Sequence, residues 1–492
     1  MLSKFRKYIE TFVENSKEYP IVFAIAAGLY SFIYIYHSNF MLVNSAFQFG
    51  IFVSLYLILP ILVFVISWQV VKRLKFLNKF QQYLLPILNA TLFAFFFTGR
   101  IYNFEQRKIM LACIIMAALL AILLRKHYKK IVVIQFIMAF VALITLLPTL
   151  YRSVFDSNEW QTQPDAIVQT KFNKFPNIYI IQPDGYVNFT ELAKDPYNFD
   201  NQEFESDLEK KNFKLYKNFR SNYTSTILSN SSMFAMKHHY KGEQLFGARE
   251  VIAGNNPVIE ILKNNDYQTF LFLENPYILL NRPTIAYDSC NFAMNEVPLF
   301  GFGAFGLQKE LIDPLAKTIQ NHRGKRNFYF IEKIAPGHIT TFKNQAQGMD
   351  VERTNYLEQV KEANTWLKEI TEVIIKNDPN SLIVIAADHG GYVGLNYTLE
   401  LFEKQTDKKL IYSAFSAVLA IKWPENDAPT FDTKLKTSVN LFRTIFTYLG
   451  DNPKLLDNFQ PDTSHSIINK NAPSGMYEYI DGDGNVFFRK VE

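Results

Sequence analysis

The sequence predicts an α/β protein with an N-terminal transmembrane domain of five helices, followed by a larger domain in which a mostly parallel β-sheet lies between helices. Long apolar runs dominate the chain from Pro20 to Leu150, whereas the composition from about Asp156 onward is that of a globular domain. In this second part, short apolar runs alternate with amphipathic helical patterns, which is typical of parallel sheets covered by helices. Polar residues follow several of the short runs, at the edge where such sheets bind ligands.

Five apolar runs predict membrane-spanning helices, at residues 20–40, 48–71, 83–99, 109–124 and 131–150. The second run is the clearest, because it lies in a stretch of 23 consecutive residues without a charge. An apolar helix of about 20 residues crosses the hydrocarbon layer of a bilayer. The third and fourth runs are shorter, but five such runs in succession are unusual in the core of a soluble protein. We therefore expect residues 1–150 to form a transmembrane domain.

Charged residues between the runs indicate the orientation of this domain. Twelve lysines and arginines fall before the first run, after the second and after the fourth, whereas four fall on the opposite side. Positively charged loops stay in the cytoplasm, so we expect the N-terminus there. An odd number of spans then places the remainder of the chain outside, in the periplasm or at the cell surface. The first run is not expected to be a cleaved signal peptide, because four further spans follow it.

Net charge and cysteine usage narrow the classes of function. The net charge of +5 is explained largely by the cytoplasmic loops, so the sequence predicts no nucleic-acid partner. The two cysteines, Cys113 in a predicted span and Cys290 in the outer part, lie in different compartments and cannot pair. The outer domain must therefore be stable through its apolar core alone, for which its length is sufficient. No feature of the sequence indicates a protein partner.

A polar linker, residues 151–172, precedes the outer domain, which we expect to span residues 173–492. Short apolar runs predict five strands in this domain, at residues 177–182, 267–273, 327–333, 381–387 and 417–423. Helical patterns fall between the strands and include 201–212 and 351–377. The Gly/Phe-rich stretch 300–306 is expected to be a loop.

Polar residues follow three of the five predicted strands. Asp184 follows the first strand, His338 follows a Pro-Gly turn after the third, and Asp388 and His389 follow the fourth. A segment rich in Ser and Thr, 221–232, leads into an apolar helical pattern. Singly, these residues can be explained as a turn residue, a surface histidine and a helix N-cap. Together they place carboxylates, imidazoles and a hydroxyl at one edge of the sheet, which predicts a functional site.

An aspartate next to a histidine offers a hard oxygen beside a nitrogen, a combination of ligands that holds divalent cations. Five motifs in order also resemble the alkaline phosphatase superfamily, and in particular its membrane-anchored sulfatase-like branch, with lipoteichoic-acid synthases and lipid A phosphoethanolamine transferases. The motifs are IIQPDGY, RSNYTSTILSNSSMF, APGHITTF, IVIAADHGG and TSVNLFRTIFTYLG, of which the Asp-His-Gly motif is the most specific. The resemblance covers nearly the whole chain, because five spans and an external domain are the architecture of this branch.

The resemblance implies a sulfatase-like fold for the outer domain and a role for each site residue. Asp184, Asp388 and His389 match metal ligands of the family. Thr226 matches the nucleophile of the transferases, which also contacts the metal. His338 matches the histidine that holds the transferred group or assists the leaving group. The implied location is the bacterial inner (cytoplasmic) membrane, with several spans and the catalytic domain on the periplasmic side.

Three departures from the family pattern limit what the resemblance implies. The transferases usually have Glu where this chain has Asp184, so this position is closer to the hydrolase members. Lys333 stands where phosphoethanolamine transferases have a further histidine, which puts a second metal and that donor in doubt. The Cys/Ser-x-Pro-x-Arg signature of sulfatases is absent near Thr226, which disfavours a sulfatase.

The predicted reaction is the transfer of a phosphorylated head group from a membrane phospholipid to an envelope glycan or lipid, through a phospho-threonine at Thr226. One divalent metal ion favours the threonine alkoxide and offsets charge on the phosphoryl group. Zinc or manganese is expected, with magnesium and calcium as alternatives. His338 is suited to protonate a departing group. Two other functions stay open: a hydrolase of phosphate or sulfate esters, and a non-catalytic membrane protein that binds an envelope glycan.

Overall fold

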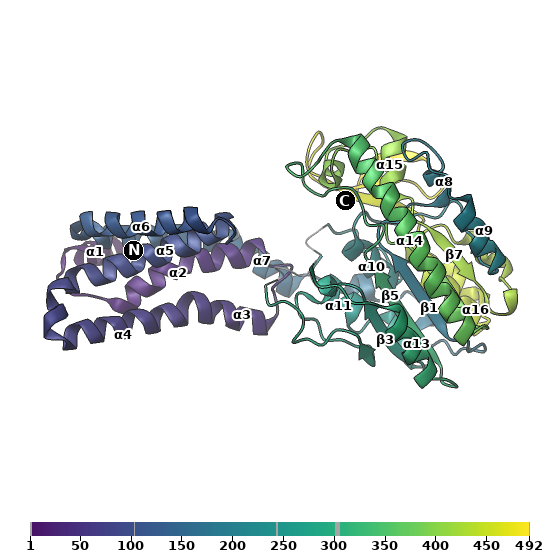
Figure 1. The fold of residues 1–492 in the computed structure, drawn as a ribbon, viewed down its shortest axis with the longest axis horizontal. Helices are drawn as coiled ribbons and strands as arrows, with labels where there is room; N and C mark the ends of the chain where they lie inside the picture. Colours follow the sequence, from purple (N-terminus) through teal and green to yellow (C-terminus); the bar gives the residue numbers. More distant parts are fainter. Residues whose placement is uncertain (1, 103, 243–244, 301–305, 492) are drawn as a thin grey trace. The chain divides into compact units, whose positions relative to one another are not determined.

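The computed structural model describes residues 2–102, 104–242, 245–300 and 306–491. The chain divides into two compact units, Met1–Asp156 and Ser157–Glu492, which carry the purple-to-blue and the blue-to-yellow parts of the ribbon (Figure 1). Most of the expected Gly/Phe-rich loop, residues 301–305, lies outside the described residues.

The N-terminal unit consists of helices. They are α1 (Leu2–Glu14), α2 (Pro20–Ser38), α3 (Ala46–Val53), α4 (Leu59–Arg73), α5 (Gln81–Tyr102), α6 (Arg107–Leu123) and α7 (Tyr128–Phe155). A π-helical turn, Ser54–Ile58, joins α3 to α4.

Within the described residues, four helical stretches are long and apolar enough to cross a membrane: Pro20–Ser38, Ala46–Arg73, Lys75–Tyr102 and Arg125–Phe155. The remaining expected span, 109–124, falls in α6, a helix of 17 residues. The apolar N-terminal helices are therefore confirmed, whereas the count of five spans stays a prediction.

Two features hold the helices of this unit together. Phe23, Ala24 and Leu85 belong to a buried apolar cluster between α2, α5 and their neighbours. At Gly28 a Cβ atom would lie 1.8 Å from the carbonyl oxygen of Tyr56, so only glycine allows these two backbones to approach so closely. Small residues serve the same purpose in membrane helix packing generally, where lipid gives helices no hydrophobic reason to associate.

A buried polar network links α2, α5 and α7. The Asn89 amide donates to the carbonyl oxygen of Phe23 at 2.7 Å and to the Gln135 side chain at 3.0 Å. The Asn89 side-chain oxygen accepts from the hydroxyl of Tyr128 at 2.6 Å and from Gln135 at 2.9 Å. Every hydrogen-bonding group of the Asn89 side chain is thus satisfied inside the unit.

The second unit is built on a seven-stranded sheet with the order β2-β7-β6-β1-β5-β3-β4. Its strands are β1 (Ile178–Pro183), β2 (Lys214–Leu215), β3 (Gln268–Leu273), β4 (Ser289–Cys290), β5 (Asn327–Lys333), β6 (Leu382–Ala386) and β7 (Leu419–Lys422). The five predicted strands all form, within one or two residues of the expected ends.

Five neighbouring strands of this sheet, from β6 to β4, run parallel, whereas β7 pairs antiparallel with β6 and β2 with β7. Every residue of β1 and β6 is buried, as expected for strands covered on both faces. The predicted mostly parallel sheet is confirmed. Ile178 of β1 pairs with Phe328 of β5 and Leu382 of β6, so these three strands end at the same edge.

The helices of this unit form two groups that pack within themselves. One group contains α9 (Gln202–Lys210), α13 (Ile312–Asn321) and α14 (Met349–Asn377). The other contains α10 (Thr226–Ala235), α11 (Ala248–Ala253), α12 (Pro257–Lys263) and α16 (Leu441–Gly450). The shorter helices α8 (Phe189–Leu192) and α15 (Lys408–Phe415) complete the unit (Figure 1).

A second, antiparallel sheet is made by β8 (Ser464–Ile468), β9 (Gly475–Ile480) and β10 (Val486–Lys490), in the order β10-β9-β8. The sequence analysis did not predict it. Its edge strand β8 contacts the Ser/Thr-rich segment: the backbone N–H of His465 donates to the carbonyl oxygen of Asn222 at 2.8 Å, and the Asn222 amide donates to the carbonyl oxygen of Thr463, just before β8, at 2.8 Å. The small sheet therefore supports the chain that leads into α10.

Candidate active site

Two aspartates stand at the common edge of β1 and β6. Asp184 directly follows β1, and a single residue, Ala387, separates Asp388 from the end of β6. Both aspartates are buried. One carboxylate oxygen of Asp388 accepts from the backbone N–H of Gly185 at 3.0 Å, whereas its Oδ2 is buried without a hydrogen-bond partner. Gly185 has a φ of +65°, and a Cβ atom there would lie 2.1 Å from the carbonyl oxygen of Gly337. Glycine at position 185 therefore allows the turn after β1 to pack against the turn after β5.

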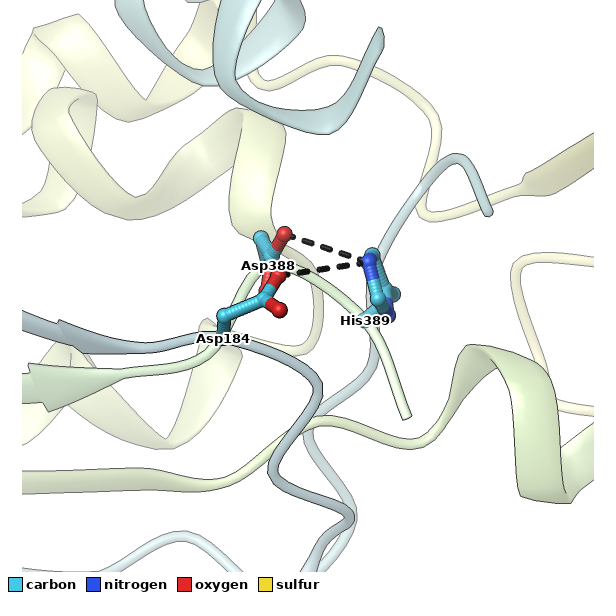
Figure 2. A group of neighbouring side chains, drawn as sticks. All are labelled: Asp184, Asp388 and His389. Carbon is cyan, nitrogen blue, oxygen red and sulfur yellow. Dashed lines mark ion pairs between the residues drawn. The ribbon is translucent and has the colours of Figure 1, made fainter. Parts of the chain in front are cut away.

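His389 completes a group with the two aspartates (Figure 2). Its Nε2 lies 3.3 Å from Oδ2 of Asp388 and 3.6 Å from Oδ1 of Asp184. Its Nδ1 lies 2.9 Å from the carbonyl oxygen of Gly390, an acceptor only, so Nδ1 carries the proton. In the neutral ring, the lone pair of Nε2 then faces the carboxylates, which is the tautomer that a metal ligand needs.

Thr226 brings a hydroxyl to the same group. It is the first residue of α10, preceded by Ser225 in extended conformation. The Thr226 hydroxyl donates to Oδ1 of Asp184 at 3.0 Å and lies 3.4 Å from Nε2 of His389. It thus stands at a helix N-terminus, where backbone N–H groups and the helix dipole favour a phosphate.

The other hydroxyls of the Ser/Thr-rich segment have different partners. The Ser229 hydroxyl donates to the carbonyl oxygen of Tyr223 at 2.8 Å, and that of Ser221 donates to the carbonyl oxygen of Phe415 at 3.1 Å. The Thr224 hydroxyl lies 3.5 Å from that of Ser466 in β8. Thr226 is therefore the hydroxyl of this segment that contacts the aspartates and His389.

The electrostatics of the group favour a bound cation. Burial raises the pKa of Asp388 to about 6. Burial by itself would lower the pKa of His389, but the carboxylates of Asp388 and Asp184 raise it above its ordinary value. Within the described residues, neither aspartate forms an ion pair with a lysine or arginine. Buried carboxylates without a cationic partner are costly, because the protein interior solvates charge poorly.

The group fits a divalent metal ion on three observations. The ligand atoms of Asp184, Asp388 and His389 all lie within 4.8 Å of one another. Oδ2 of Asp388 has no hydrogen-bond partner, and Nε2 of His389 presents a lone pair. Oxygen and nitrogen donors of this kind suit zinc, manganese, magnesium and calcium to different degrees. This buried Asp-Asp-His group thus suggests a divalent metal site, and it does not identify the ion.

His338 lies beside this group rather than within it. Its ring centroid is 5.9 Å from that of His389. Its Nδ1 lies 2.7 Å from the carbonyl oxygen of Ile339, an acceptor only, and 3.2 Å from the hydroxyl of Thr398. Nδ1 therefore donates to Ile339, and the side chain is exposed, so Nε2 is available to a bound molecule.

A cavity of about 200 Å³ joins these residues. Thr226, His338 and His389 line it, and so do five apolar side chains and several hydroxyl-bearing residues: Leu228, Leu399, Leu401, Phe402, Ile467, Thr224, Ser225, Thr341, Tyr392, Thr398 and Ser466. No lysine or arginine is among the described residues that line it. Every site residue that the sequence predicted is therefore brought to one place: Thr226, His338 and His389 line the cavity, and Asp184 and Asp388 lie 3.6 and 3.3 Å from Nε2 of His389.

Two further residues near the aspartates were not predicted from the sequence, the buried Glu332 and the half-buried Tyr277. Glu332 of β5 is completely buried, and burial, together with the charges of Asp184 and Asp388, raises its pKa well above the ordinary value. The Tyr277 hydroxyl donates to Oε1 of Glu332 at 3.1 Å. A glutamate inside the apolar run 327–333 was a signal that could have been used, whereas nothing near Tyr277 in the sequence points to the site.

Lys333, the position at which the sequence departs from the phosphoethanolamine transferases, forms an ion pair with Glu274. The other oxygen of Glu274 accepts from the backbone N–H of Ile334 at 2.8 Å. The Lys333 ammonium is therefore occupied by a structural partner next to the turn that carries His338.

No protein-family model and no curated protein matches the sequence. Solved structures do match. The lipoteichoic acid synthase LtaP from Listeria monocytogenes is similar at 15% identity and a TM-score of 0.43, over 65% of this chain and 90% of that one. The C-terminal periplasmic domain of EcEptC from Escherichia coli is similar at 13% identity and a TM-score of 0.40, over 62% of this chain and 93% of that one. A complex of that domain with Zn also matches.

The corresponding domain of the phosphoethanolamine transferase EptC from Campylobacter jejuni is similar at 13% identity and a TM-score of 0.37, over 61% of this chain and 97% of that one. A sulfatase from Bacteroides thetaiotaomicron is also among the matches, at 12% identity and a TM-score of 0.39, over 64% of this chain and 89% of that one. At these identities, what this chain does has to be inferred from its own residues.

Proposed function

We propose that this protein is a membrane-anchored metalloenzyme that transfers a phosphorylated head group from a phospholipid to an envelope glycan or lipid through a phospho-threonine intermediate. One observation carries the proposal: the Thr226 hydroxyl, at the N-terminus of α10, donates to Asp184 within a buried Asp-Asp-His group. The apolar N-terminal helices support a substrate that resides in a bilayer.

Asp184, Asp388, His389 and the Thr226 hydroxyl would hold one divalent metal ion, zinc or manganese in the first place and magnesium or calcium as alternatives. When bound, such an ion lowers the pKa of a coordinated hydroxyl and offsets negative charge on a phosphoryl oxygen. The protein contributes the rest: it fixes Thr226 at the end of a helix, and the carbonyl oxygen of Gly390 holds the proton of the neutral His389 ring on Nδ1.

In the first half of the reaction, Oγ1 of Thr226 attacks the phosphorus of the donor and loses its proton to Asp184, whose Oδ1 already accepts it as a hydrogen bond. The backbone N–H groups at the start of α10 bind the phosphoryl oxygens. The bond from phosphorus to the diacylglycerol oxygen breaks, and protonated His338 donates from Nε2 to that oxygen. The products are a phospho-threonine diester and diacylglycerol.

In the second half, a hydroxyl of the acceptor gives its proton to Nε2 of His338 and attacks the same phosphorus. The bond to Oγ1 of Thr226 breaks, and Asp184 returns its proton to the threonine. The head group is now on the acceptor. If water takes the place of the acceptor hydroxyl, the same steps hydrolyse the ester, which is the alternative function. A glycan-binding protein without catalysis has no need for a hydroxyl held against a candidate metal group, and we do not favour it.

We also propose the domain organisation and location that the sequence predicts. Residues 1–150 would form the transmembrane domain, 151–172 the linker and 173–492 the extracytoplasmic catalytic domain, in the bacterial inner membrane with a cytoplasmic N-terminus. A fusion of a periplasm-dependent phosphatase after Glu492 should be active and a fusion after residue 77, in the predicted cytoplasmic loop, inactive. The reverse pattern would contradict the orientation.

The reaction is tested by intact-mass and peptide mass spectrometry of the purified full chain after incubation with phospholipid vesicles and Zn²⁺ or Mn²⁺, without acceptor. A head-group phosphate on the peptide that contains Thr226 is expected, and its mass identifies the transferred group. The Thr224→Ala variant is the matched control, because its hydroxyl faces Ser466, and it should still form the adduct. An adduct on another residue, or none while product accumulates, would contradict the phospho-threonine intermediate.

A further inference from the structure

A pocket of about 320 Å³ lies within the N-terminal unit, between α2 and α5. The side chains that matter here are Ser31 and Tyr34 from α2, and Phe97, Arg100 and Ile101 from α5. An arginine and a serine are unusual in the wall of a pocket that is otherwise aromatic and aliphatic, in a unit dominated by apolar helices.

The arginine of this pocket has no anionic partner. Arg100 is in the last turn of α5, with its guanidinium carbon 5.9 Å from the centre of the Tyr34 ring. Its Nε is buried without a hydrogen-bond partner, and no carboxylate among the described residues forms an ion pair with it. A guanidinium stays charged at any physiological pH. A charged group in a membrane domain that lacks a protein counter-ion is a candidate binding site for a ligand.

A second polar group in the pocket is also without a partner. Ser31 is only 2% exposed, and its hydroxyl oxygen makes no hydrogen bond within the described chain. Serines in membrane helices usually return their hydroxyl to the carbonyl of the preceding turn, as Ser54 does to Gly50 in the same unit. The free hydroxyl of Ser31 and the free Nε of Arg100 are two hydrogen-bonding groups presented by adjacent helices to one small volume.

The surroundings of the pocket indicate what kind of anion fits. Phe97 and Ile101, on α5, are 37% and 56% exposed, so apolar surface extends from the pocket along the outside of the helix. Arg100 is near the C-terminal end of α5, the end that the positive-inside rule assigns to the external side of the membrane. A free inorganic anion would use Arg100 but not the apolar surface. A glycerophospholipid has a phosphate for the arginine and acyl chains for the apolar side chains.

We propose that this pocket binds the phosphate group of a glycerophospholipid of the outer leaflet. Arg100 would donate two hydrogen bonds to the phosphate oxygens, in the bidentate geometry that guanidinium groups adopt with phosphates. The Ser31 hydroxyl would donate to a further lipid oxygen, and one acyl chain would lie along Phe97 and Ile101. This inference rests on the proposed insertion of the N-terminal unit in a membrane, but it does not require the transfer reaction at Thr226.

The test is native mass spectrometry of the full chain in a non-ionic detergent, titrated with phosphatidylglycerol. Two parallel titrations use dioleoylglycerol, which lacks the phosphate, and inorganic phosphate, which lacks the acyl chains. The wild-type chain should retain one phosphatidylglycerol at concentrations at which neither other probe is retained. Arg100→Gln should weaken this binding about tenfold, because a charge-assisted hydrogen bond is lost. Ser31→Ala should weaken it less, by about threefold.

Arg107→Gln is the matched control, since this arginine is exposed, lies outside the pocket and falls on the same predicted side of the membrane. It should bind as the wild-type chain does. Arg100→Lys is a control for misfolding, because it keeps the positive charge at this position. It should bind phosphatidylglycerol more tightly than Arg100→Gln and less tightly than the wild type. Thr226→Ala should bind lipid normally, which separates failure of this site from failure of the proposed reaction.

Three results would overturn the proposal. Equal retention of phosphatidylglycerol by the wild type and Arg100→Gln would mean that Arg100 only meets lipid head groups at the surface. Equal retention of dioleoylglycerol would make the pocket an apolar groove. Retention of inorganic phosphate as tight as that of phosphatidylglycerol would assign the site to a free anion.

Discussion

Both units bury polar side chains, but the two groups differ in whether their hydrogen-bonding atoms have partners. In the N-terminal unit, Asn89, Gln135 and Tyr128 satisfy one another, and each donor and acceptor of the Asn89 amide has a partner. At the end of the large sheet, Oδ2 of Asp388 and Oε2 of Glu332 are buried and have none. A complete network stabilises the fold that contains it, whereas an incomplete one costs stability unless something else binds there. The satisfied network around Asn89 is therefore structural, whereas the unsatisfied atoms of Asp388 and Glu332 indicate a binding site.

The largest effect is expected at Thr226, the proposed nucleophile. Thr226→Ala removes the hydroxyl that contacts the incomplete group and should lower turnover of a phospholipid donor by about 10³-fold or more, as loss of a covalent nucleophile usually does. The measurement is release of diacylglycerol by the purified full chain. Thr224→Ala should cost far less. Near-normal turnover of Thr226→Ala would make Thr224 the candidate.

Metal content should respond to the aspartate and histidine at the end of β6. Asp388→Ala and His389→Ala each remove a ligand and should abolish both activity and stoichiometric metal, measured by elemental analysis after desalting. The fold should persist, because these side chains end a strand and do not fill the core. Asn89→Leu serves as a control that disturbs the other unit only, and its metal content should match that of the wild type. Full metal content in both site variants would place the site elsewhere.

The complete network can be broken on purpose. Asn89→Leu leaves Gln135 and Tyr128 without their partners and should lower the stability of the detergent-solubilised chain by about 1 kcal/mol. Thermal unfolding followed by the loss of helical signal measures this. Thr91→Val is the matched control in the same helix, because the Thr91 hydroxyl donates only to Ile87 and Leu88 of its own turn. An equal loss in both variants would show that the network contributes nothing of its own.

The smallest effect is expected at Glu332. Burial and the charges of Asp184 and Asp388 raise the pKa of Glu332, which accepts a hydrogen bond from Tyr277, and glutamine has nearly the same shape without charge. Glu332→Gln should therefore keep both metal content and melting temperature close to those of the wild type. A clear loss of metal would mean instead that Glu332 is an ionised ligand, and the site would need to be redrawn around three carboxylates.

Much of the outer domain was predictable, because its central strands are short apolar runs that end in polar residues. The runs that became β1, β5 and β6 were identified to within a residue at most positions, and Asp184, His338 and Asp388 follow them as expected. The order of strands brings these residues together, and parallel pairing places their ends at one edge. The placement of Thr226 followed from the helix that begins at it.

Other features had no local signal. The strands β8, β9 and β10 of the small sheet are short and partly polar. They pair with one another and with the segment before Thr226. Tyr277 reaches the site only because β3 lies beside β5 in the sheet. Helix α6 has 17 residues because the chain turns after Leu123, and the position of this turn cannot be read from apolar composition. Long-range contacts decided each of these.

The bonds between the small sheet and the segment before Thr226 have a consequence for when the protein becomes active. Asn222 and Thr463, which are joined by one of these bonds, are 241 positions apart in the chain. During synthesis, the segment that carries the threonine emerges long before the strand that supports it. The hydroxyl can therefore be held in place only after β8 has been made. Activity would begin as the last structural step of maturation, when nearly all of the chain has left the ribosome.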